Sequence, residues 1–327
     1  MNKPKIYIAQ NVPGEVEKYI AQFCDYDKWE GNGAISRGEL IAKIADKDGL
    51  LISGLSGIKL DEELISNAPN LKVVSDITVG YDNFDLAAMK KRNVIGTNTP
   101  GILDETVADL IFSLILSSAR RVTELDRYVK EGNWKKSDNE KLFGIDVHHR
   151  TLGIIGMGRI GEAVAKRAKL GFDMEVCYYN RNRKKDTEEK LGVKYYDFKT
   201  LLRSSDFILL MTPLNDETYQ LVGEEEFNLM KNTAIFINAS RGKTVDEKAL
   251  IEALEGKKIL GAGLDVYEAE PIDINNPLLK MSNVVTLPHL GSATHKTRAD
   301  MAMLAAQNLI KGLSGEVPPC IVPELKR

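Results

Sequence analysis

Residues 151–161 have the sequence TLGIIGMGRIG, in which an apolar run leads directly into a glycine-rich turn. The run predicts a buried strand and the residues after the turn predict a helix, which is the context that gives a GxGxxG string its meaning. Gly156 permits the tight turn, Gly158 lets a pyrophosphate approach the backbone, and Gly161 lets helix and strand pack closely. The start of the helix also offers unpaired N–H groups to phosphates. We therefore predict a dinucleotide site in mid-chain; a glycine-rich turn without a ligand is the alternative.

A basic run follows the next apolar segment and bears on which dinucleotide is bound. Residues 174–179 predict a second strand, which ends in NRNRKK, residues 180–185. NAD sites place an acid about 20 residues beyond the motif, on the ribose 2′-OH, but this chain has Arg181 there. Arg181 and Arg183 could grip a 2′-phosphate through charge-assisted hydrogen bonds, whereas a carboxylate would repel it. The run predicts NADPH as the cofactor, with NADH possible at lower affinity; a solvated basic loop is the alternative.

Composition and charge describe an ordinary globular chain of a size that suggests two domains. Of its 327 residues, 43% are hydrophobic and 28% are charged, and the net charge of -3 gives no electrostatic reason to expect nucleic acid. The longest apolar stretch, residues 110–116, is too short to span a bilayer, and residues 1–10 predict a strand rather than a signal peptide. Three widely spaced cysteines suggest reduced thiols, and no metal-ligand spacing occurs. We expect a cytoplasmic protein with no metal, membrane or nucleic-acid partner.

Strand and helix signals alternate through both halves of the chain, which predicts an α/β fold with parallel sheets. The six strands of the second half match a doubly wound dinucleotide fold. Strands are expected at residues 5–9, 49–52, 71–74 and 94–97, and then at 151–155, 174–179, 207–211, 234–238, 260–265 and 284–287. Helices are expected at residues 14–23, 60–66, 84–91, 160–169, 198–204, 224–230 and 247–254. Three longer features are a single helix over residues 105–130, an irregular arm over 133–150 and a final helix over 293–313.

Three segments that follow successive strands of the second half contain candidate catalytic residues. They are residues 237–242, 263–271 and 287–292, which hold Arg241, Glu270 and His289. Because ligands of open α/β sheets bind beyond the carboxyl ends of the strands, these side chains are expected to converge. Arginine offers a planar fork for a carboxylate, histidine is the natural acid near neutral pH, and a neighbouring glutamate favours the protonated imidazole. The set suits reduction of a 2-oxo acid by hydride from a nicotinamide. Taken singly, each residue has a structural alternative: a loop charge, a helix-end acid or a satisfied histidine.

Together these segments resemble the D-isomer-specific 2-hydroxyacid dehydrogenases, and the resemblance runs nearly end to end. Its motifs are VGYDN at residues 79–83, ETVAD at 105–109, TP at 212–213, NASRG at 238–242, DVYEAEP at 265–271 and PHLGS at 288–292. The resemblance implies that Arg241 binds substrate, that His289 is the acid/base and that Glu270 is its partner. It also implies that backbone N–H groups of Val79 and Gly80 hold the substrate carboxylate, with Leu55 in the pocket-lining stretch.

The family architecture implies a Rossmann domain, residues 100–290, inserted in a flavodoxin-like substrate domain made from residues 1–99 and 291–327. It also implies a homodimer held through the cofactor domain, in which Trp134 of one subunit approaches the substrate of the other. A dimer-packing role is the alternative for Trp134. The residues expected at the cofactor are Thr106, Gly156, Gly158, Arg159, Ile160, Gly161, Asn180, Arg181, Arg183, Thr212, Pro213, Ala239, Asp265, His289 and Gly291.

The basic run resembles the NADPH-using glyoxylate/hydroxypyruvate reductases and the related 2-ketogluconate reductases. Glyoxylate, hydroxypyruvate and 2-ketogluconate are therefore all open as substrates, with a D-2-hydroxy acid as the product. A different class of function is a dinucleotide-sensing binding protein on the same fold, similar to the transcriptional corepressors of this family, which keep the same three catalytic residues. An NAD-dependent member of the family is a third reading.

Overall fold

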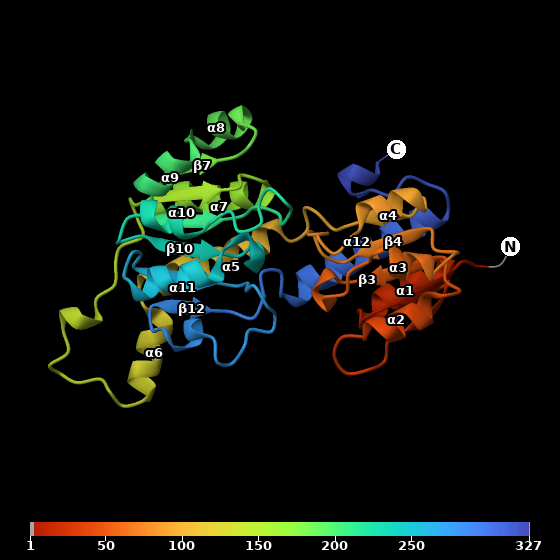
Figure 1. Cartoon of the computed structure of the whole chain (residues 1–327), viewed down its shortest axis with the longest axis horizontal. Coiled ribbons are helices and arrows are strands. Elements are labelled where there is room, and N and C mark those ends of the chain that lie inside the picture. Colours follow the sequence, from red (N-terminus) through yellow and green to blue (C-terminus); the bar gives the residue numbers. More distant parts are fainter. Residues whose placement is uncertain (1–2, 327) are drawn as a thin grey trace. The chain divides into compact units, whose positions relative to one another are not determined.

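The structure is a computed structural model that describes residues 3–326, and these residues form two compact units (Figure 1). Unit 1 consists of the chain up to Leu103 together with the chain from Ala293 onward. Unit 2 consists of Asp104–Ser292 and therefore interrupts unit 1 in the sequence. Each unit has its own parallel sheet and its own hydrophobic core.

The sheet of unit 1 contains five parallel strands among the described residues, in the order β2-β1-β3-β4-β5. Counted along the chain, this is the 2-1-3-4-5 order of flavodoxin-like folds. Every residue of β3 and β4 is buried, as expected for parallel strands with helices on both faces. The strands are β1 (Lys5–Ile8), β2 (Asp25–Lys28), β3 (Gly49–Ile52), β4 (Val73–Asp76) and β5 (Ile95–Thr97).

The helices of unit 1 come from both ends of the chain. They are α1 (Gly14–Phe23), α2 (Arg37–Ile44), α3 (Glu62–Ser66), α4 (Leu86–Lys91) and α12 (His295–Leu313), with the 3-10 turns η1 (Gly54–Ser56) and η5 (Pro323–Leu325). Helix α12 packs on β3, β4 and β5 and against α1. The approach is close, since a Cβ on Gly312 would lie 2.8 Å from Val73 Cγ2. Ser75 on β4 also donates its hydroxyl to the Ala305 carbonyl at 2.7 Å, so sequence-distant segments share one core.

The sheet of unit 2 has seven parallel strands within the described part of the chain, in the order β12-β11-β10-β9-β6-β7-β8. Its first six strands along the chain follow the doubly wound order 3-2-1-4-5-6, and the order reverses between β6 and β9. Ligands of such folds bind beyond the carboxyl ends of the strands near that reversal. The strands are β6 (Thr151–Ile155), β7 (Glu175–Tyr179), β8 (Lys194–Tyr195), β9 (Phe207–Leu210), β10 (Ile235–Asn238), β11 (Gly261–Leu264) and β12 (Val284–Thr286).

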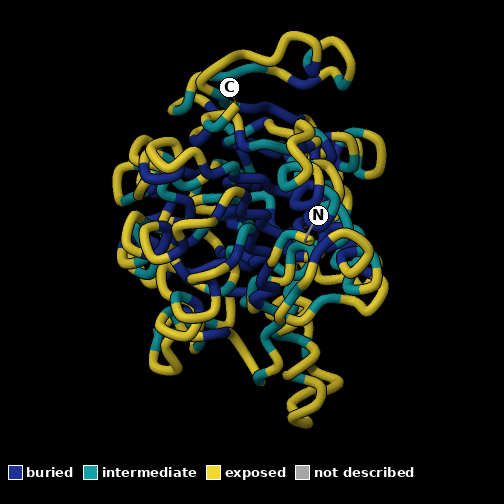
Figure 2. Tube along the Cα trace, turned by 90° about the vertical axis from the view of Figure 1, so that its right-hand side faces the viewer, coloured by how far each residue is buried: buried dark blue, intermediate teal, exposed yellow. Residues whose placement is uncertain are grey.

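Helices cover this sheet, and every residue of its strands β9, β10 and β11 is buried. Figure 2 shows buried segments in dark blue toward the inside of the molecule and exposed segments in yellow toward the outside. Helix α5 packs against β10, β11 and β12 and against α7. The helices are α5 (Asp104–Ala119), α6 (Val122–Lys130), α7 (Arg159–Phe172), α8 (Lys185–Leu191), α9 (Phe198–Ser204), α10 (Glu224–Leu229) and α11 (Glu247–Glu255). The 3-10 turns are η2 (Glu140–Leu142), η3 (Gly242–Thr244) and η4 (Pro277–Lys280). No helix within residues 3–326 is both long enough and apolar enough to cross a membrane.

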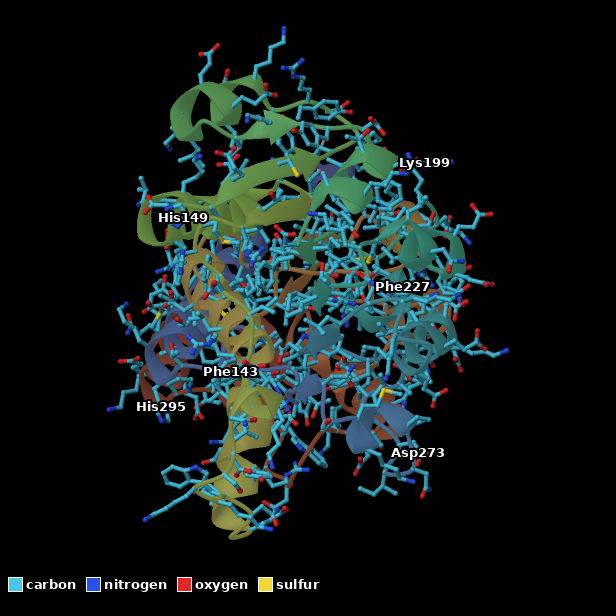
Figure 3. All side chains as sticks on the ribbon, turned by 90° about the vertical axis from the view of Figure 1, so that its left-hand side faces the viewer. Phe143, His149, Lys199, Phe227, Asp273 and His295 are labelled. Atoms are coloured by element: carbon cyan, nitrogen blue, oxygen red, sulfur yellow. The ribbon has the colours of Figure 1, made fainter. Side chains whose placement is uncertain are left out.

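The expected single helix over residues 105–130 is wrong, because the structure has two helices there with a break at Arg121. Arg121 has a positive φ of 56°, and its guanidinium donates to the carbonyls of Lys141 and Phe143 at 2.7 and 3.2 Å. It also pairs with Glu124 at 2.7 Å. The two carbonyls lie 20 and 22 residues further along the chain, and no glycine or proline marks the break. Figure 3 labels Phe143 beside α5 and α6.

The α/β fold class, a Rossmann domain inserted in a flavodoxin-like one, is confirmed by the two sheets. Four short elements were not expected from the sequence: β2, α2, β8 and α8. Strand β2 has the sequence DYDK, which lacks the apolar run that marks a buried strand. Among the described residues it pairs with β1 alone, at the sheet edge. Strand β8 adds a seventh strand to the six expected and has only two residues, Lys194 and Tyr195. The edge position of β2 and the short length of β8 explain why the pattern of apolar residues did not reveal these two strands.

Candidate active site

The glycine-rich turn lies between β6 and α7, where a phosphate would meet a helix N-terminus. Gly156 has a φ of 105°, and a Cβ there would lie 2.5 Å from the Met211 carbonyl oxygen. Gly158 caps α7 without any side-chain hydrogen bond, and a Cβ on it would meet nothing within 4 Å. A Cβ on Gly161 would lie 2.7 Å from the Gly156 carbonyl oxygen. Gly156 and Gly161 are therefore required by close packing, whereas Gly158 faces open space in front of the helix.

The surroundings of this turn fit a dinucleotide. Thr212 follows β9, and its hydroxyl is buried with no hydrogen-bond partner among the described residues. The next residue, Pro213, accepts a hydrogen bond from Thr218 at 2.6 Å, which fixes the turn. Arg159, at the start of α7, donates to Asp104 at 3.2 Å and keeps most of its side chain exposed. An unpaired buried hydroxyl beside an open helix N-terminus suits a ligand that brings its own polar groups.

The other residues expected at the cofactor also belong to unit 2. Thr106 lies in the first turn of α5, and a Cβ on Gly291 would lie 3.4 Å from Val107 on the same helix. Ile160 is the second residue of α7, and Ala239 follows β10 directly. Both are partly exposed.

Asn180, at the end of β7, is held by the glycine-rich turn itself. Its side-chain oxygen accepts from the Met157 N–H at 2.7 Å, and its amide donates to the Met157 carbonyl at 3.3 Å. Asn180 therefore ties the second strand to the phosphate-binding turn. This contact uses one acceptor site of the side-chain oxygen and one N–H of the amide, so one acceptor site and one N–H remain for a ligand.

The two arginines of the basic run differ in how fully neighbouring carboxylates bind them. Arg183 makes two hydrogen bonds to Glu188, at 2.7 and 2.6 Å. Together with Tyr178, Arg183 lowers the pKa of Glu188 to about 2. Arg181 pairs with Glu217 at 2.5 Å, and both side chains are largely exposed. Arg181 is therefore the more available of the two for a 2′-phosphate, but Glu217 competes for it.

The catalytic candidates lie at one edge of the sheet. Strands β10, β11 and β12 are neighbours, with Asn238 opposite Leu264 and Leu264 opposite Thr286. The segments that follow these positions therefore leave the sheet at the same carboxyl edge. Figure 1 shows β7, β10 and β12 following one another in that order across the sheet of unit 2.

Arg241 stands on a turn that is held by buried polar side chains. Asn238, which is 1% exposed, donates to the Arg241 carbonyl at 3.1 Å and accepts from the Ser240 N–H at 3.0 Å. Thr244 donates its hydroxyl to the same carbonyl at 2.6 Å. At Gly242 a Cβ would fall 1.8 Å from the Tyr267 backbone, so only glycine fits. The backbone of Arg241 is fixed before any ligand binds.

His289 and Glu270 form a direct pair, with Nδ1 of the imidazole 2.7 Å from Oε2 of the carboxylate. The side chains are 24% and 35% exposed, so the pair is reachable from solvent. The other oxygen of Glu270 accepts from the Tyr267 N–H at 3.0 Å. Although burial acts to raise it, the pKa of Glu270 is lowered by His289, by that N–H and by the charge of Arg241. The three side chains thus interact electrostatically at one edge of the sheet.

Asp265 holds the turn that carries His289. Its carboxylate accepts from the N–H groups of Leu290 at 2.7 Å and Gly291 at 2.9 Å, and its carbonyl accepts from the His289 N–H at 2.9 Å. His289 has a φ of 55°, a left-handed conformation that these bonds stabilise. Asp265 is 1% exposed, and burial raises the pKa of its carboxyl although the two N–H groups and His289 act in the opposite direction.

The expected substrate-binding residues of unit 1 lie on two loops of that unit. Val79 and Gly80 follow β4, and Leu55 lies in η1, where it is 43% exposed. The carbonyls of Val79 and Gly80 accept from Asn98 at 2.7 Å and from Thr78 at 2.8 Å. Their N–H groups have no hydrogen-bond partner among residues 3–326. The loop therefore presents two donors for a ligand.

Trp134 lies on the arm after α6 and is 69% exposed. Within the described part of the chain, no cluster of His, Cys, Asp and Glu suited to a metal ion is found.

Three supporting residues were not predicted from the sequence: Asn238, Glu217 and Asp76. Asn238 was visible as a polar residue that ends a buried strand, but Glu217 lies in a polar loop with no local signal.

The fold and the glycine-rich turn define a dinucleotide-binding oxidoreductase class. Residues 112–291 match the family model described as D-isomer specific 2-hydroxyacid dehydrogenase, NAD binding domain. The glyoxylate reductase of Thermococcus litoralis is 48% identical over 324 residues, which cover 98% of this chain and 97% of that protein. The chain belongs to the D-isomer specific 2-hydroxyacid dehydrogenase family.

Two further relatives bear on the comparison. The glyoxylate/hydroxypyruvate reductase B of Yersinia pestis is 44% identical, over 99% of this chain and 98% of that one. Among solved structures, the NADPH-dependent glyoxylate/hydroxypyruvate reductase of Sinorhizobium meliloti, in complex with NADP and malonate, is 30% identical. That match has a TM-score of 0.86 and covers 100% of this chain and 99% of that chain.

Proposed function

We propose that this protein reduces a small 2-oxo acid to the D-2-hydroxy acid with NADPH, and that Arg241, Glu270 and His289 carry the reaction. The observation that carries the proposal is the 2.7 Å contact between His289 and Glu270. It stands at the sheet edge that also bears Arg241, in the unit that holds the glycine-rich turn. A general acid with a fixed carboxylate partner and a nearby cation are what reduction of an anionic carbonyl compound requires.

The chemistry follows from the orientation of these side chains. A bound nicotinamide nucleotide would supply the hydride. The planar guanidinium of Arg241 binds the substrate carboxylate through paired hydrogen bonds. Because Nδ1 of His289 faces Glu270, the proton for the carbonyl oxygen comes from Nε2. The lowered pKa of Glu270 keeps it a carboxylate, which stabilises the protonated imidazole until the proton is delivered.

We also propose that the open N–H groups of Val79 and Gly80 bind a substrate carboxylate and that Leu55 contacts the substrate. Two backbone donors side by side can receive one carboxylate without any charged side chain. Their carbonyls are already bonded, which leaves the donors oriented for a ligand.

Glyoxylate and hydroxypyruvate are the substrates we favour, because the relatives named above are reductases of those acids. 2-Ketogluconate stays a candidate through the resemblance of the basic run. All three acids carry a carboxylate, which Arg241 would bind, and a 2-oxo group, which His289 would protonate.

NADPH is the proposed cofactor, with NADH bound at lower affinity. Arg181, at the position where NAD-binding members carry an acid, supports this preference, as does the NADPH dependence of the Sinorhizobium meliloti reductase. The residues proposed to line the nucleotide are the glycine-rich turn (Gly156, Gly158, Arg159, Ile160, Gly161), the basic run (Asn180, Arg181, Arg183), and Thr106, Thr212, Pro213, Ala239, Asp265 and Gly291.

We also propose a homodimer formed through unit 2. Helix α6 has no buried residue, and it exposes Val122 and Val129 to 50% and 52%. The arm after it exposes Trp134 and Phe143 to 69% and 68%. Figure 1 shows α6 and this arm extending away from the sheet of unit 2. Four large apolar side chains on one extended segment are poorly placed in a monomer, and a second copy would cover them.

A kinetic panel tests the proposed function. The wild-type protein is assayed with glyoxylate, hydroxypyruvate, 2-ketogluconate and pyruvate, each with NADPH and with NADH. We expect turnover of glyoxylate and hydroxypyruvate, with a higher kcat/KM for NADPH than for NADH. Tight nucleotide binding without turnover of any 2-oxo acid would reject the proposal and favour a dinucleotide-sensing binding protein. Equal use of both nucleotides would reject the cofactor preference alone.

A further inference from the structure

We propose that Asp76 is a positioning residue that holds the two substrate-binding loops of unit 1 in register, an inference that rests on the proposed function. Asp76 is the last residue of β4 and is 0% exposed. No step of the proposed reaction uses its carboxylate. A buried acid without a chemical role needs another reason for its place, and its contacts supply one.

The carboxylate of Asp76 gathers hydrogen bonds from both loops. Its Oδ1 accepts from the Gly54 N–H at 3.0 Å, from the Thr78 N–H at 2.8 Å and from the Thr78 hydroxyl at 2.6 Å. Its Oδ2 accepts from the side-chain amide of Asn83 at 3.1 Å. Gly54 begins the turn that carries Leu55, while Thr78 and Asn83 flank the loop 79–80. One side chain therefore links the two loops that carry Leu55, Val79 and Gly80.

Packing around the carboxylate is as close as these bonds imply. A Cβ on Gly54 would lie 2.9 Å from the Thr78 hydroxyl oxygen and 3.2 Å from Asp76 Oδ2. The backbone at Gly54 can approach the carboxylate only because it lacks a side chain. A shift of the carboxylate would therefore move the Leu55 turn as well as Thr78.

Thr78 transmits this position to the loop 79–80. Its hydroxyl contacts both Asp76 Oδ1 and the Gly80 carbonyl oxygen, and its own carbonyl accepts from the Thr99 N–H at 3.0 Å. With the Val79 carbonyl held by Asn98, the carbonyls of three successive residues are fixed. The direction of the open N–H groups of Val79 and Gly80 follows from that arrangement.

The conservative replacement for Asp76 is asparagine. Burial raises the pKa of the Asp76 carboxyl, although bonds from Thr78, Gly54 and Asn83 act in the opposite direction. Asparagine keeps one acceptor oxygen for the N–H groups of Gly54 and Thr78. Its amide can pair with Asn83, whose Oδ1 is buried without a hydrogen-bond partner among the described residues. Alanine keeps none of these bonds.

The test compares Asp76→Ala and Asp76→Asn with Ser75→Ala as a matched control. Ser75 is the neighbouring buried residue on β4, and it bonds to Ala305 and Thr97 instead of the substrate loops. We expect Asp76→Ala to raise the KM for glyoxylate about 10- to 100-fold, the size of effect that small misplacements of binding groups produce. The KM and Kd for NADPH should change little, since the glycine-rich turn belongs to unit 2. Asp76→Asn should restore most of the substrate affinity.

A folded Asp76→Ala protein with an unchanged KM for glyoxylate would overturn the inference, as would an equal rise in KM in Ser75→Ala. If Asp76→Ala does not fold, Thr78→Val takes its place, because it removes the hydroxyl between Asp76 and Gly80 at similar volume. A wild-type protein without turnover would reject the proposed function instead. Hydrogen–deuterium exchange then decides on Asp76: faster exchange over residues 53–56 and 77–83 in Asp76→Ala, absent in Ser75→Ala, supports it, and unchanged exchange rejects it.

Discussion

At the scale of single residues, the site depends on polar side chains that fix other groups. Asp265 holds the His289 turn, Asn238 holds the Arg241 turn, and Glu270 holds the imidazole. Each fixes its partner before substrate arrives. Such prior orientation is what makes hydrogen bonds effective in a transition state, because they need not reorganise during the reaction.

His289→Ala tests the assigned acid. We expect the kcat for 2-oxo acid reduction to fall by about 10²- to 10⁴-fold, the usual contribution of a positioned acid. The Kd for NADPH, measured by fluorescence titration, should stay within about twofold, because the proposed phosphate contacts lie on the glycine-rich turn. Retained turnover would remove His289 from the acid role. Glu270→Gln is the companion variant: it preserves the shape beside Nδ1 but not the charge, so it should lose less activity.

Arg181→Ala tests the nucleotide preference. We expect the Kd for NADPH to rise about 3- to 10-fold with the Kd for NADH nearly unchanged, a modest effect because Arg181 is largely exposed. Glu217→Gln should shift the NADPH affinity in the opposite direction, since it removes the carboxylate that competes for Arg181.

Arg183→Ala is the control for that experiment. It removes an equal charge, but Glu188 already holds the Arg183 guanidinium, so we expect a smaller change in NADPH affinity. Equal losses for NADPH and NADH in Arg181→Ala would show that Arg181 does not read the 2′-phosphate.

At the scale of elements, apolar runs were sufficient to locate the central strands and most helices. Residues 14–23, 49–52, 151–155 and 198–204 form the elements that their patterns predict, with the predicted bounds. Edge elements lack that signal, because a strand such as β2 has polar side chains on an exposed face. Their positions follow from pairing with neighbours, which a local pattern does not encode.

The break between α5 and α6 illustrates the same limit. Residues 105–130 contain no helix breaker, and a continuous helix is the reasonable local prediction. The contacts of Arg121 with the Lys141 and Phe143 carbonyls compete with the next helical turn and stabilise a left-handed residue instead. Those carbonyls are brought near only when the arm folds back on α5.

At the scale of the whole molecule, the exposed apolar side chains of unit 2 bear on assembly. We expect the wild-type protein to sediment as a dimer and Val129→Asp to sediment largely as a monomer, because a buried carboxylate would oppose association. Analytical ultracentrifugation measures this directly. Ile274→Asp is the control, because Ile274 is 80% exposed and lies outside α6 and the arm. A monomeric wild-type protein, or equal effects of both substitutions, would contradict the proposed interface.

The candidate site shows the same division between local and distant information. Arg241, Glu270 and His289 could be proposed because each follows a strand of one parallel sheet, and parallel order sends such residues to one edge. The linkage of Gly54, Asp76 and Thr78 could not be proposed, because it joins residues 22 positions apart through a side chain that lies two residues beyond the strand predicted at 71–74.

Local sequence patterns are sufficient for the fold class, the family and the phosphate-binding turn, because strand, glycine turn and helix are encoded by residues next to one another. Three features depend on the folded structure: which arginine of the basic run stays available, where α5 ends and which acid links the loops of unit 1. In each of those cases a side chain is engaged by a partner that only folding brings near: Glu188 for Arg183, the arm carbonyls for Arg121 and the Gly54 backbone for Asp76. Charge-assisted and buried hydrogen bonds depend on distances of about 3 Å, and local sequence patterns carry no information about them.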